Sequence, residues 1–421
     1  MDSRIKELID YTFETFGLGN YHLYSHRLYR SVNYFNETTY TLSMEWFPLH
    51  NEEREEEDLN PEGTACIDID VHARQFKSVI FVGGITYAER PTFPKGDKHH
   101  LIHWIENETG LLFNEQFKLI KAGDRKYQFQ GCVDGIAVSP YGMIDVELNE
   151  EGKLTLFSID GHFPTKESVQ ESPFVLTLEN VESFVKQQLK CIELPSDEKQ
   201  QLVPVYAIEE IYVTNDQQSA IPFEPVVDRR LYCINKMMHW QSTLEKAFEE
   251  RTINVDDEVT PEQAFSCEPH PDSFLITKDE QEKCILAVET CLRQVYPNDC
   301  GKWIFKTLHR QDGYIVATLR HAKSDNQVFR RKLQVILDAK SFEVLNYIDN
   351  EFLNVVYENF QEAEKVKISR DEAYDIMKTK IKLTPVYVYD FQQNKYIMCG
   401  KIDSQYGVHA GRGQLILLNS F

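Results

Sequence analysis

Acidic and imidazole side chains stand close together at two places in this sequence. Asp68, Asp70 and His72 alternate with the apolar residues of one run, and Asp160-Gly161-His162 again places an acid beside an imidazole. Such pairs can supply the acid and the base of a hydrolytic reaction. On a strand, Asp68, Asp70 and His72 share one face and could converge on a cation or a proton-transfer site. The alternative is the solvated face of an antiparallel sheet, whose buried face would carry Ile67, Ile69 and Val71. We prefer this second interpretation.

Three further histidines, His99, His100 and His103, could act as metal ligands. On a helix His99 and His103 would share a face, a spacing that can bind a transition metal. A convincing site needs a third or fourth ligand, and the sequence supplies no further Cys or His nearby. A solvated histidine cluster is therefore the preferred interpretation. The sequence assigns no catalytic residue, no metal ligand and no cofactor.

Motifs of nucleophilic and phosphate chemistry are missing from the sequence. It has no Gly-x-Ser-x-Gly, no His-Glu-x-x-His and no phosphate loop. Gly411-Arg412-Gly413 precedes an expected strand and does not open a helix, which argues against a dinucleotide site. Met237-Met238-His239-Trp240, in an expected helix from Leu231 to Phe248, is a candidate partner-binding face. Met and aromatic residues at helical spacing more often belong to a core.

Composition limits the class of protein and of partner. The chain of 421 residues is long enough for two to four domains, and its 42% hydrophobic and 12% aromatic content is that of a folded protein rich in sheet. A net charge of −22 argues against a nucleic acid or an anionic membrane as partner, because both require clustered Lys and Arg. The nine cysteines include no CxxC pair, which favours free, mostly buried thiols in a reducing compartment. With no signal peptide or transmembrane run visible, we expect a cytoplasmic protein without membrane insertion.

Hydrophobic periodicity predicts helices that alternate with short antiparallel strands. The expected helices cover 3–16, 100–109, 177–189, 231–248 and 279–296, with another that opens at Ser369 in a capping box with Glu372. Aromatic and β-branched runs predict strands over 21–24, 30–34 and 40–46, before an acidic loop over 51–63. The segment 251–272 looks the least structured and is the expected linker between two larger halves.

A short strand-turn-strand phrase recurs along the chain. We align His72-Ala73-Arg74-Gln75-Phe76-Lys77 with Asp338-Ala339-Lys340-Ser341-Phe342-Glu343 and with His409-Ala410-Gly411-Arg412-Gly413-Gln414. A fourth copy, from Leu148 to Leu154, is one residue shorter. Small and adaptable residues permit a tight reversal between strands, and an Asp or His at the start can cap it. Repetition of this kind indicates that one supersecondary unit has been multiplied, usually as a scaffold or binding surface.

This order of elements resembles the PepSY-type unit, and the chain is similar to the tandem-repeat YcdB/YcdC-like proteins of bacilli. The resemblance rests on Ser369-Arg370-Asp371-Glu372-Ala373, on Leu383-Thr384-Pro385-Val386-Tyr387 and on the phrase that starts at His409. It implies an α+β fold of tandem cystatin-like units, each a helix packed on a curved antiparallel sheet. It also implies control of a peptidase or hydrolase, usually outside the cytoplasm. His72 and His409, where the family has an acid, depart from its pattern.

From these observations we expect PepSY-like units over 1–90, two more with a connecting helix over 96–250, and a C-terminal pair over 273–421. The expected function is non-enzymatic protein binding or regulation through sheet faces and the grooves between units, with a protein partner of unknown identity. The alternative is a hydrolase whose Asp/His site lies between repeats. An enzyme needs acid, base and pocket within hydrogen-bond reach, whereas a binding scaffold leaves them dispersed.

Overall fold

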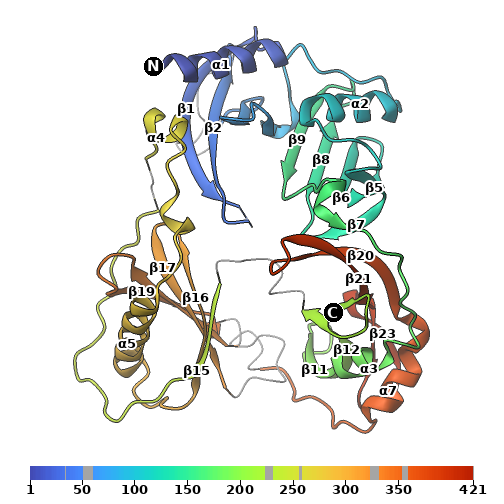
Figure 1. Ribbon diagram of the computed structural model, residues 1–421, viewed down its shortest axis with the longest axis vertical. Coiled ribbons are helices and arrows are strands. Elements are labelled where there is room, and N and C mark those ends of the chain that lie inside the picture. Colours follow the sequence, from blue (N-terminus) through green and yellow to red (C-terminus); the bar gives the residue numbers. More distant parts are fainter. Residues whose placement is uncertain are drawn as a thin grey trace. The chain divides into compact units, whose positions relative to one another are not determined.

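The computed structural model describes residues 1–33, 35–50, 60–222, 231–255, 258–322, 331–352 and 359–420 (Figure 1). The chain divides into two compact units. Unit 1 combines Met1–Ser172 with 257–270 and 386–398, and unit 2 contains the remainder. Both are α+β, and their sheets are mostly antiparallel.

The sheet of unit 1 is built from two successive groups of strands. Its strands follow the order β1-β2-β3-β4-β9-β8-β6-β5, and all of these neighbours are antiparallel. The bounds are β1 Tyr21–Val32, β2 Thr38–Pro48, β3 Ala65–Asp70, β4 Phe76–Phe81, β5 Phe117–Ala122, β6 Lys126–Val133, β8 Met143–Leu148 and β9 Leu154–Asp160. The pairing of β4 with β9 joins the two groups into one surface.

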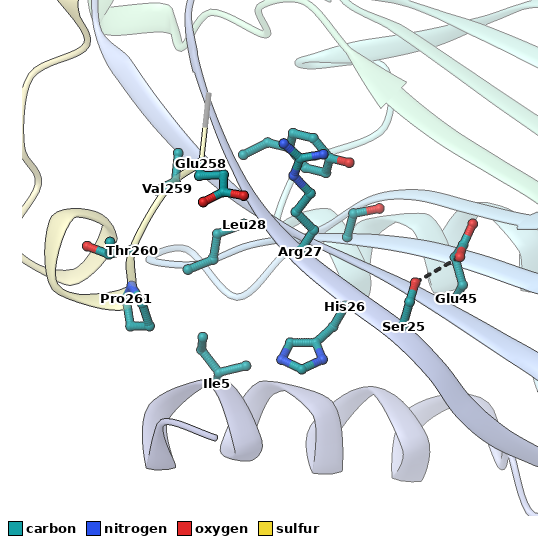
Figure 2. Close-up of a pocket in the computed structure, with 12 residues that line it drawn as sticks. Ile5, Ser25, His26, Arg27, Leu28, Glu45, Glu258, Val259, Thr260 and Pro261 are labelled. Carbon is teal, nitrogen blue, oxygen red and sulfur yellow. Dashed lines mark hydrogen bonds between the residues drawn. The ribbon is translucent and has the colours of Figure 1, made fainter. Parts of the chain in front are cut away.

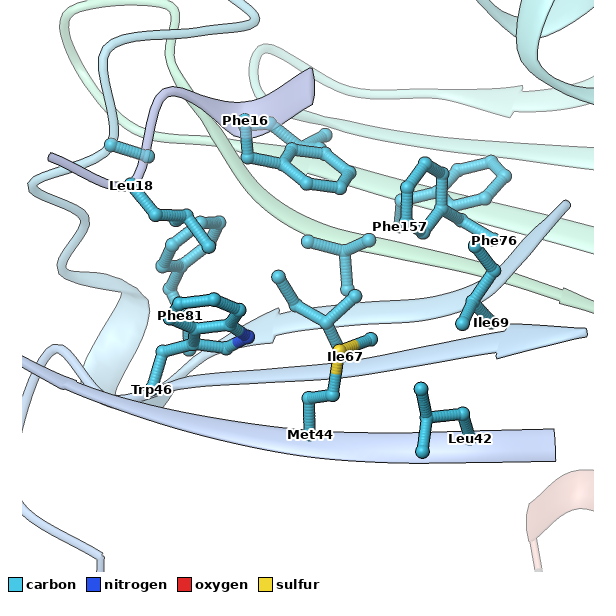
Figure 3. Close-up of a cluster of buried hydrophobic side chains, with 14 of the residues drawn as sticks. Phe16, Leu18, Leu42, Met44, Trp46, Ile67, Ile69, Phe76, Phe81 and Phe157 are labelled. Atoms are coloured by element: carbon cyan, nitrogen blue, oxygen red, sulfur yellow. The ribbon is translucent and has the colours of Figure 1, made fainter. Parts of the chain in front are cut away.

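Helices α1 (Ser3–Phe16) and α2 (Lys98–Thr109) pack on the same face of this sheet. Each places apolar residues at helical spacing into one core, for example Leu8 and Phe16 from α1 and Leu101 and Ile105 from α2. Figure 3 shows how alternate residues of the strands, such as Leu42 and Met44 of β2, fill the space beneath α1. Most residues of the opposite face are polar, for example Ser43, Asp68 and Asp145.

Three short elements complete unit 1. Strand β7 (Ile136–Ser139) pairs antiparallel with β6 and parallel with 386–388 of β20 (Lys382–Asp390). Strand β10 (Val169–Gln170) pairs parallel with 396–397 of β21 (Lys395–Asp403). The helix α4 (Pro261–Phe265) begins with a capping box at Thr260, and its Ala264 is fully buried in the core of unit 1.

Unit 2 contains a five-stranded antiparallel sheet with α5 (Lys278–Val295) packed on it. The strand order is β15-β16-β17-β18-β19, and the bounds are β15 Tyr232–Met237, β16 Trp303–Gln311, β17 Tyr314–His321, β18 Lys332–Asp338 and β19 Val344–Asp349. The buried face of α5 carries Cys284, Val288, Cys291 and Leu292 against Trp303 and Phe305.

A second core of unit 2 forms between helices α3 (Glu182–Gln188) and α7 (Arg370–Met377) and short antiparallel strands. One sheet runs β11-β12-β22-β23, with bounds Leu189–Ser196, Gln201–Ile208, Tyr406–His409 and Leu415–Leu417. Strands β13 (Ile211–Thr214) and β14 (Ala220–Pro222) pair with each other, and β13 also pairs with 399–402 of β21. Helix α7 begins in the expected capping box of Ser369 and Glu372.

All four copies of the recurring phrase form the turn between two adjacent antiparallel strands. In three of them the backbone carbonyl of the residue that begins the turn accepts the backbone amide of the residue four positions later. That later residue has a positive φ. The pairs are Asp70 with Arg74, Asp338 with Phe342, and His409 with Gly413. Asn149 and Gly152 play these parts in the shorter copy.

The alignment predicted for the first copy is therefore wrong by two residues. Asp70, and not His72, occupies the position of Asp338. Its Oδ1 accepts the amides of His72 and Ala73, as Asp338 Oδ1 accepts those of Lys340 and Ser341. The acidic residue that seemed replaced in this copy is present, whereas His409 does take the place of an acid.

Several predicted elements differ from the structure. The helix expected over 231–248 is wrong, because 232–237 pairs with β16 as strand β15 and this pairing overrides the local pattern. The strands expected over 21–24 and 30–34 are parts of one strand, β1, and Tyr34 lies outside the described residues. So do 51–59 of the acidic loop and 256–257. The expected linker 251–272 contains helix α4, and its part from 258 to 270 belongs to unit 1.

Candidate binding groove

An open groove of about 720 Å³ lies along strand β1 in unit 1 (Figure 2). Strand β1 supplies one wall, Ile5 of α1 closes one side, and the segment that leads into α4 supplies the other wall. The lining residues are Ile5, Ser25, His26, Arg27, Leu28, Tyr29, Ser43, Glu45, Glu258, Val259, Thr260 and Pro261.

The groove follows the edge of β1 and extends over the polar face of the sheet to Ser43 and Glu45 of β2. Five successive residues, from Ser25 to Tyr29, line it. Because successive side chains of a strand point to opposite faces, a space that touches all five must pass along the strand's edge. Figure 2 shows His26 on the side of α1 and Ser25 on the other side, beside Glu45. β1 is also the terminal strand of the described sheet.

The second wall is held in place by side-chain and backbone contacts between the segment 258–270 and strand β2. The Tyr40 hydroxyl donates to the carbonyl of Glu268, and the amide of His270 donates to Thr38 Oγ1 over 2.8 Å. Within the segment, Ala264 is buried in the core of unit 1, and Val259 packs against the same core. The segment is thus a fixed part of unit 1, although more than 200 residues separate it from β1 in the sequence.

Charged and apolar groups both face the groove. Leu28, Val259 and Pro261 offer apolar surface, and the guanidinium of Arg27 lies 5.2 Å from the centre of the Tyr29 ring. The Glu45 carboxylate accepts from Ser25 Oγ over 2.8 Å and from Asn60 Nδ2 over 2.9 Å. This arrangement can bind a polypeptide.

A row of polar residues crosses the sheet from the groove. Pairing in register places Arg27, Ser43, Asp68, Ser78, Ser158, Asp145 and Gln128 directly opposite one another on consecutive strands. Directly opposed residues share one face of a sheet. Asp68 therefore belongs to the solvated face, while Ile67, Ile69 and Val71 are buried.

The contacts of Asp70 and His72 do not bring a carboxylate to the imidazole ring. Asp70 caps the turn through Oδ1, and its Oδ2 lies 3.4 Å from Lys77 Nζ. His72 Nε2 instead lies 3.0 Å from the carbonyl oxygen of Ala264 and 3.6 Å from Cys267 Sγ. The acid-base site predicted as an alternative is not assembled here, and a pair of His72 with Cys267 stands in its place.

The second acid-imidazole pair is also separated by its surroundings. Asp160 is exposed at the end of β9, whereas the His162 ring packs between aromatic rings, 4.4 Å from that of Phe35 and 6.1 Å from that of Tyr396. Burial lowers the pKa of His162, so the ring favours its neutral form. This histidine serves as a packed aromatic side chain.

The remaining sequence-based candidates lie on the surface or in a core. His99, His100 and His103 are exposed on α2, and the described residues contain no group of three or more His, Cys, Asp or Glu placed to hold a metal ion. Met238 is buried in the core of α5, so Met237 to Trp240 do not form one exposed helical face.

Comparisons with known proteins give one structural likeness. No protein-family model matches the chain, and no curated protein matches it. Among solved structures, the C-terminal domain of Bacillus megaterium YpeB is similar over 49% of this chain and 86% of that chain, at 11% identity and a TM-score of 0.23. Both values are too low to indicate a shared activity or partner. In the described part of the chain no helix is long and apolar enough to cross a membrane.

The groove was missed by the reasoning from sequence. Ser25 to Tyr29 lie between two predicted strands, and Glu258 to Pro261 fall in the predicted linker. The only local signal is the Thr260-Pro261 start of a capped helix, because Pro is favoured at the first helical position.

Proposed function

We propose that this protein is a non-enzymatic binding protein that holds an extended segment of a partner protein in the groove along β1. The observation that carries the proposal is the course of the groove along the edge of a terminal strand. An extended peptide adds to such an edge through main-chain hydrogen bonds, while pockets select its alternate side chains. When the groove holds this segment of the partner, the segment is no longer available for the partner's own activity, and the partner is thereby controlled.

The groove also suggests the chemistry of the partner segment. Its volume of about 720 Å³ falls in the range of sites that bind small molecules and a few side chains. Leu28, Val259 and Pro261 favour an apolar side chain, and Glu258 favours a basic one. The net charge of −22 attracts basic segments over acidic ones. We therefore propose an extended segment with alternating apolar residues and at least one Lys or Arg.

The shape of β1 supports selective pairing over self-association. A long, flat, apolar edge strand is an aggregation hazard, and proteins protect such edges with charges, bulges or a covering segment. β1 has a register irregularity between Leu23 and Ser25, it carries Arg27, and the segment 258–261 lies beside it. These features leave room for a segment that fits and disfavour one that does not.

The tandem-unit architecture is part of the same proposal. We infer that α1 with β1–β4 and α2 with β5–β9 are PepSY-like units, and that α5 with β16–β19 is another. A helix on an antiparallel sheet with the recurring turn between its last strands supports this assignment in each case. The boundaries 1–90, 96–250 and 273–421 and a cytoplasmic location remain proposals.

A peptide selection with matched variants tests the proposal. Displayed peptides of about ten residues, a length suited to one strand, would be selected on the full chain. The affinities of the selected peptides for the Tyr29→Ala and Tyr141→Ala variants would then be compared. The two tyrosines are similarly exposed, at 45% and 46%, but of these two only Tyr29 lines the groove. We expect Tyr29→Ala to weaken binding about fivefold or more and Tyr141→Ala to leave it unchanged.

Main-chain pairing has its own readout. N-methylation at alternate peptide positions removes every second donor, so one of the two methylation patterns should abolish binding and the other should preserve it. Glu258→Lys should also reduce the preference for basic peptides. Selected peptides that bind equally well to Tyr29→Ala, or that tolerate both methylation patterns, would overturn the proposal.

A further inference from the structure

The main chain of β1 has one edge that pairs with β2 and one edge that faces away from it. Along an antiparallel pair, residues that bond to the partner strand alternate with residues whose N–H and C=O point outward. The hairpin end fixes this alternation, because the amide of Asn33 donates to the carbonyl of Glu37 over 3.0 Å. The register is continuous from there to Ser25. Counting back from Asn33, every second residue bonds to β2, and the residues between them, among them His26 and Leu28, point their main chain outward.

The next pair of strands gives the same alternation. Tyr40 of β2 lies opposite Arg30 of β1. The carbonyl of Tyr40 accepts the amide of Val71 over 3.0 Å, so the main chain of Tyr40 points toward β3. Tyr40 and Arg30 therefore form one of the pairs that are not hydrogen-bonded to each other. His26 and Leu28 are two and four residues from Arg30, so they belong to the same outward set.

The outward main chain of His26 and Leu28 is open to the groove. Both residues line the groove together with 258–261. Among the described residues, no backbone hydrogen bond reaches the amide or the carbonyl of either residue. Unpaired N–H and C=O groups at the edge of a sheet are a template for another strand. Two such sets, separated by one residue, match the spacing at which an added strand forms its hydrogen bonds.

The two sides of this edge differ in chemistry. Leu28 is buried in the core on the side of α1, and Figure 2 shows His26 on that side as well. Ile5 and Val259, which both line the groove, pack in the same core. A residue of an added strand that lies opposite Leu28 shares its face and meets these apolar side chains. The residues next to it project over the polar face of the sheet.

We infer that the groove binds its partner segment as an added β-strand, which pairs with the outward main chain of His26 and Leu28 and places aliphatic side chains on the side of α1. Valine and isoleucine suit these positions best, because they combine apolar surface with a preference for strands. The lining residues Ser25 to Tyr29 span about 13 Å, which corresponds to about five residues of the partner. This inference rests on the proposed function of the groove and specifies its ligand.

Charge favours a segment of another protein over a second copy of this chain. Each copy carries a net charge of −22, so two copies repel each other, whereas a basic segment is attracted. Glu258 in the wall of the groove adds to this preference. We therefore expect the wild-type protein to be monomeric in sedimentation. A dimer that the His26→Pro substitution dissociates would show that a second copy occupies the edge, and would overturn the inference.

The first experiment tests the pairing register without any peptide. Residue-resolved hydrogen exchange is measured on the full chain. The amides of Arg27 and Tyr29 bond to β2 in this register, whereas those of His26 and Leu28 do not. We expect the amides of His26 and Leu28 to exchange about tenfold faster or more than those of Arg27 and Tyr29. Equal protection of the four amides, or the reverse order, would overturn the register.

The second experiment blocks the edge. His26→Pro removes the outward N–H and places a ring in the path of an added strand, and proline is tolerated in edge strands where the N–H faces away from the sheet. His26→Ala is the matched variant, because it keeps the N–H. With peptides selected on the full chain, we expect His26→Pro to weaken binding about tenfold or more and His26→Ala to change it less than about twofold.

The outcomes separate the register from the function. Unchanged affinity in His26→Pro, together with weaker binding in Tyr29→Ala, would overturn the register and leave the groove function in place. Failure of wild type to bind any selected peptide would overturn both. A third measurement needs no variant: saturating peptide should slow exchange at His26 and Leu28 in wild type. Unaltered exchange at both amides in the bound protein would also overturn the register.

The peptide itself reports on the two sides of the edge. Aspartate is introduced at each position of a selected peptide in turn. We expect the large losses of affinity at alternate positions, those that face α1, and small losses at the positions between them. Equal losses at neighbouring positions would contradict the preference for aliphatic side chains on the side of α1.

Discussion

Asp338 offers the sharpest test of the recurring turn. Its Oδ1 accepts the amides of Lys340 over 3.0 Å and of Ser341 over 2.7 Å, while its own amide and carbonyl close the turn with Glu343 and Phe342. Asp338→Ala removes both side-chain hydrogen bonds. By analogy with helix caps, where loss of such an acceptor costs about 0.5–2 kcal/mol, we expect a loss of about 1–2 kcal/mol.

Asp338→Asn is the matched variant, because it keeps the acceptor and removes the charge. The shorter copy of the turn already uses an asparagine, because Asn149 Oδ1 accepts the amides of Glu151 and Lys153. We therefore expect Asp338→Asn to lose about half as much stability or less, since neutral hydrogen bonds are weaker than charged ones.

The pH dependence of this contribution has a definite sign. The hydrogen bond from the amide of Ser341 is the main cause that lowers the pKa of Asp338 in the folded protein. A carboxyl whose pKa is depressed by folding stabilises the fold above its unfolded pKa of about 3.9 and loses that contribution as the pH falls through the folded value. The difference between wild type and Asp338→Asn should therefore shrink as the pH falls below about 4.

Native-state hydrogen exchange of strands β18 and β19 measures these changes locally. The β3–β4 hairpin, with its intact Asp70 turn, serves as the reference within the same molecule. Faster exchange in β18 and β19 with unchanged exchange in β3 and β4 is the expected result. Equal exchange in wild type and Asp338→Ala would refute the capping role.

Three further changes test other parts of the fold. Arg74→Gly should stabilise unit 1 by about 0.5 kcal/mol in thermal unfolding, because relief of a left-handed φ outweighs loss of the exposed ion pair with Glu7. Gly152→Ala should lower stability by about 2 kcal/mol or more, since a Cβ there would lie 2.1 Å from the Phe93 carbonyl oxygen at a φ of 79°. Folding lowers the pKa of His162, so the unfolded chain binds a proton there more readily than the folded protein does. Wild type should therefore lose stability as the pH falls below about 6.5. In urea titrations over this pH range, His162→Phe should lose less stability than wild type.

Local patterns predicted several helices and three of the four turns, because both depend on short-range spacing. The opening helix, α2, α5 and the capping box at Ser369 stand where the periodicity indicated. The pattern over 231–248 failed, because 232–237 form a strand whose residues are mostly exposed, so their apolar spacing does not mark a buried helix face. There the pairing partner β16, some 70 residues away, decides the structure.

The misalignment of the first turn has a geometric reason. A shift of two residues along a strand returns every side chain to the same face, so the apolar pattern around Asp70 and His72 fits both registers equally. What distinguishes the registers is the left-handed fifth residue. Only one of its three examples, Gly413, is a glycine, whereas Arg74 and Phe342 give no such signal in the sequence. Conformation could therefore not be inferred from residue type at this position.

The same limit explains why the groove could not be found from the sequence. Its two walls are local structures of ordinary appearance, a polar strand and a short capped helix. They become a site because the Tyr40 hydroxyl and Thr38 hold the segment 258–270 against the start of the sheet. His72, in the β3–β4 turn, adds a third contact, because its Nε2 lies 3.0 Å from the carbonyl oxygen of Ala264. The groove therefore depends on contacts between residues that are 192 to 232 positions apart in the chain, and no local pattern of the sequence reveals such contacts.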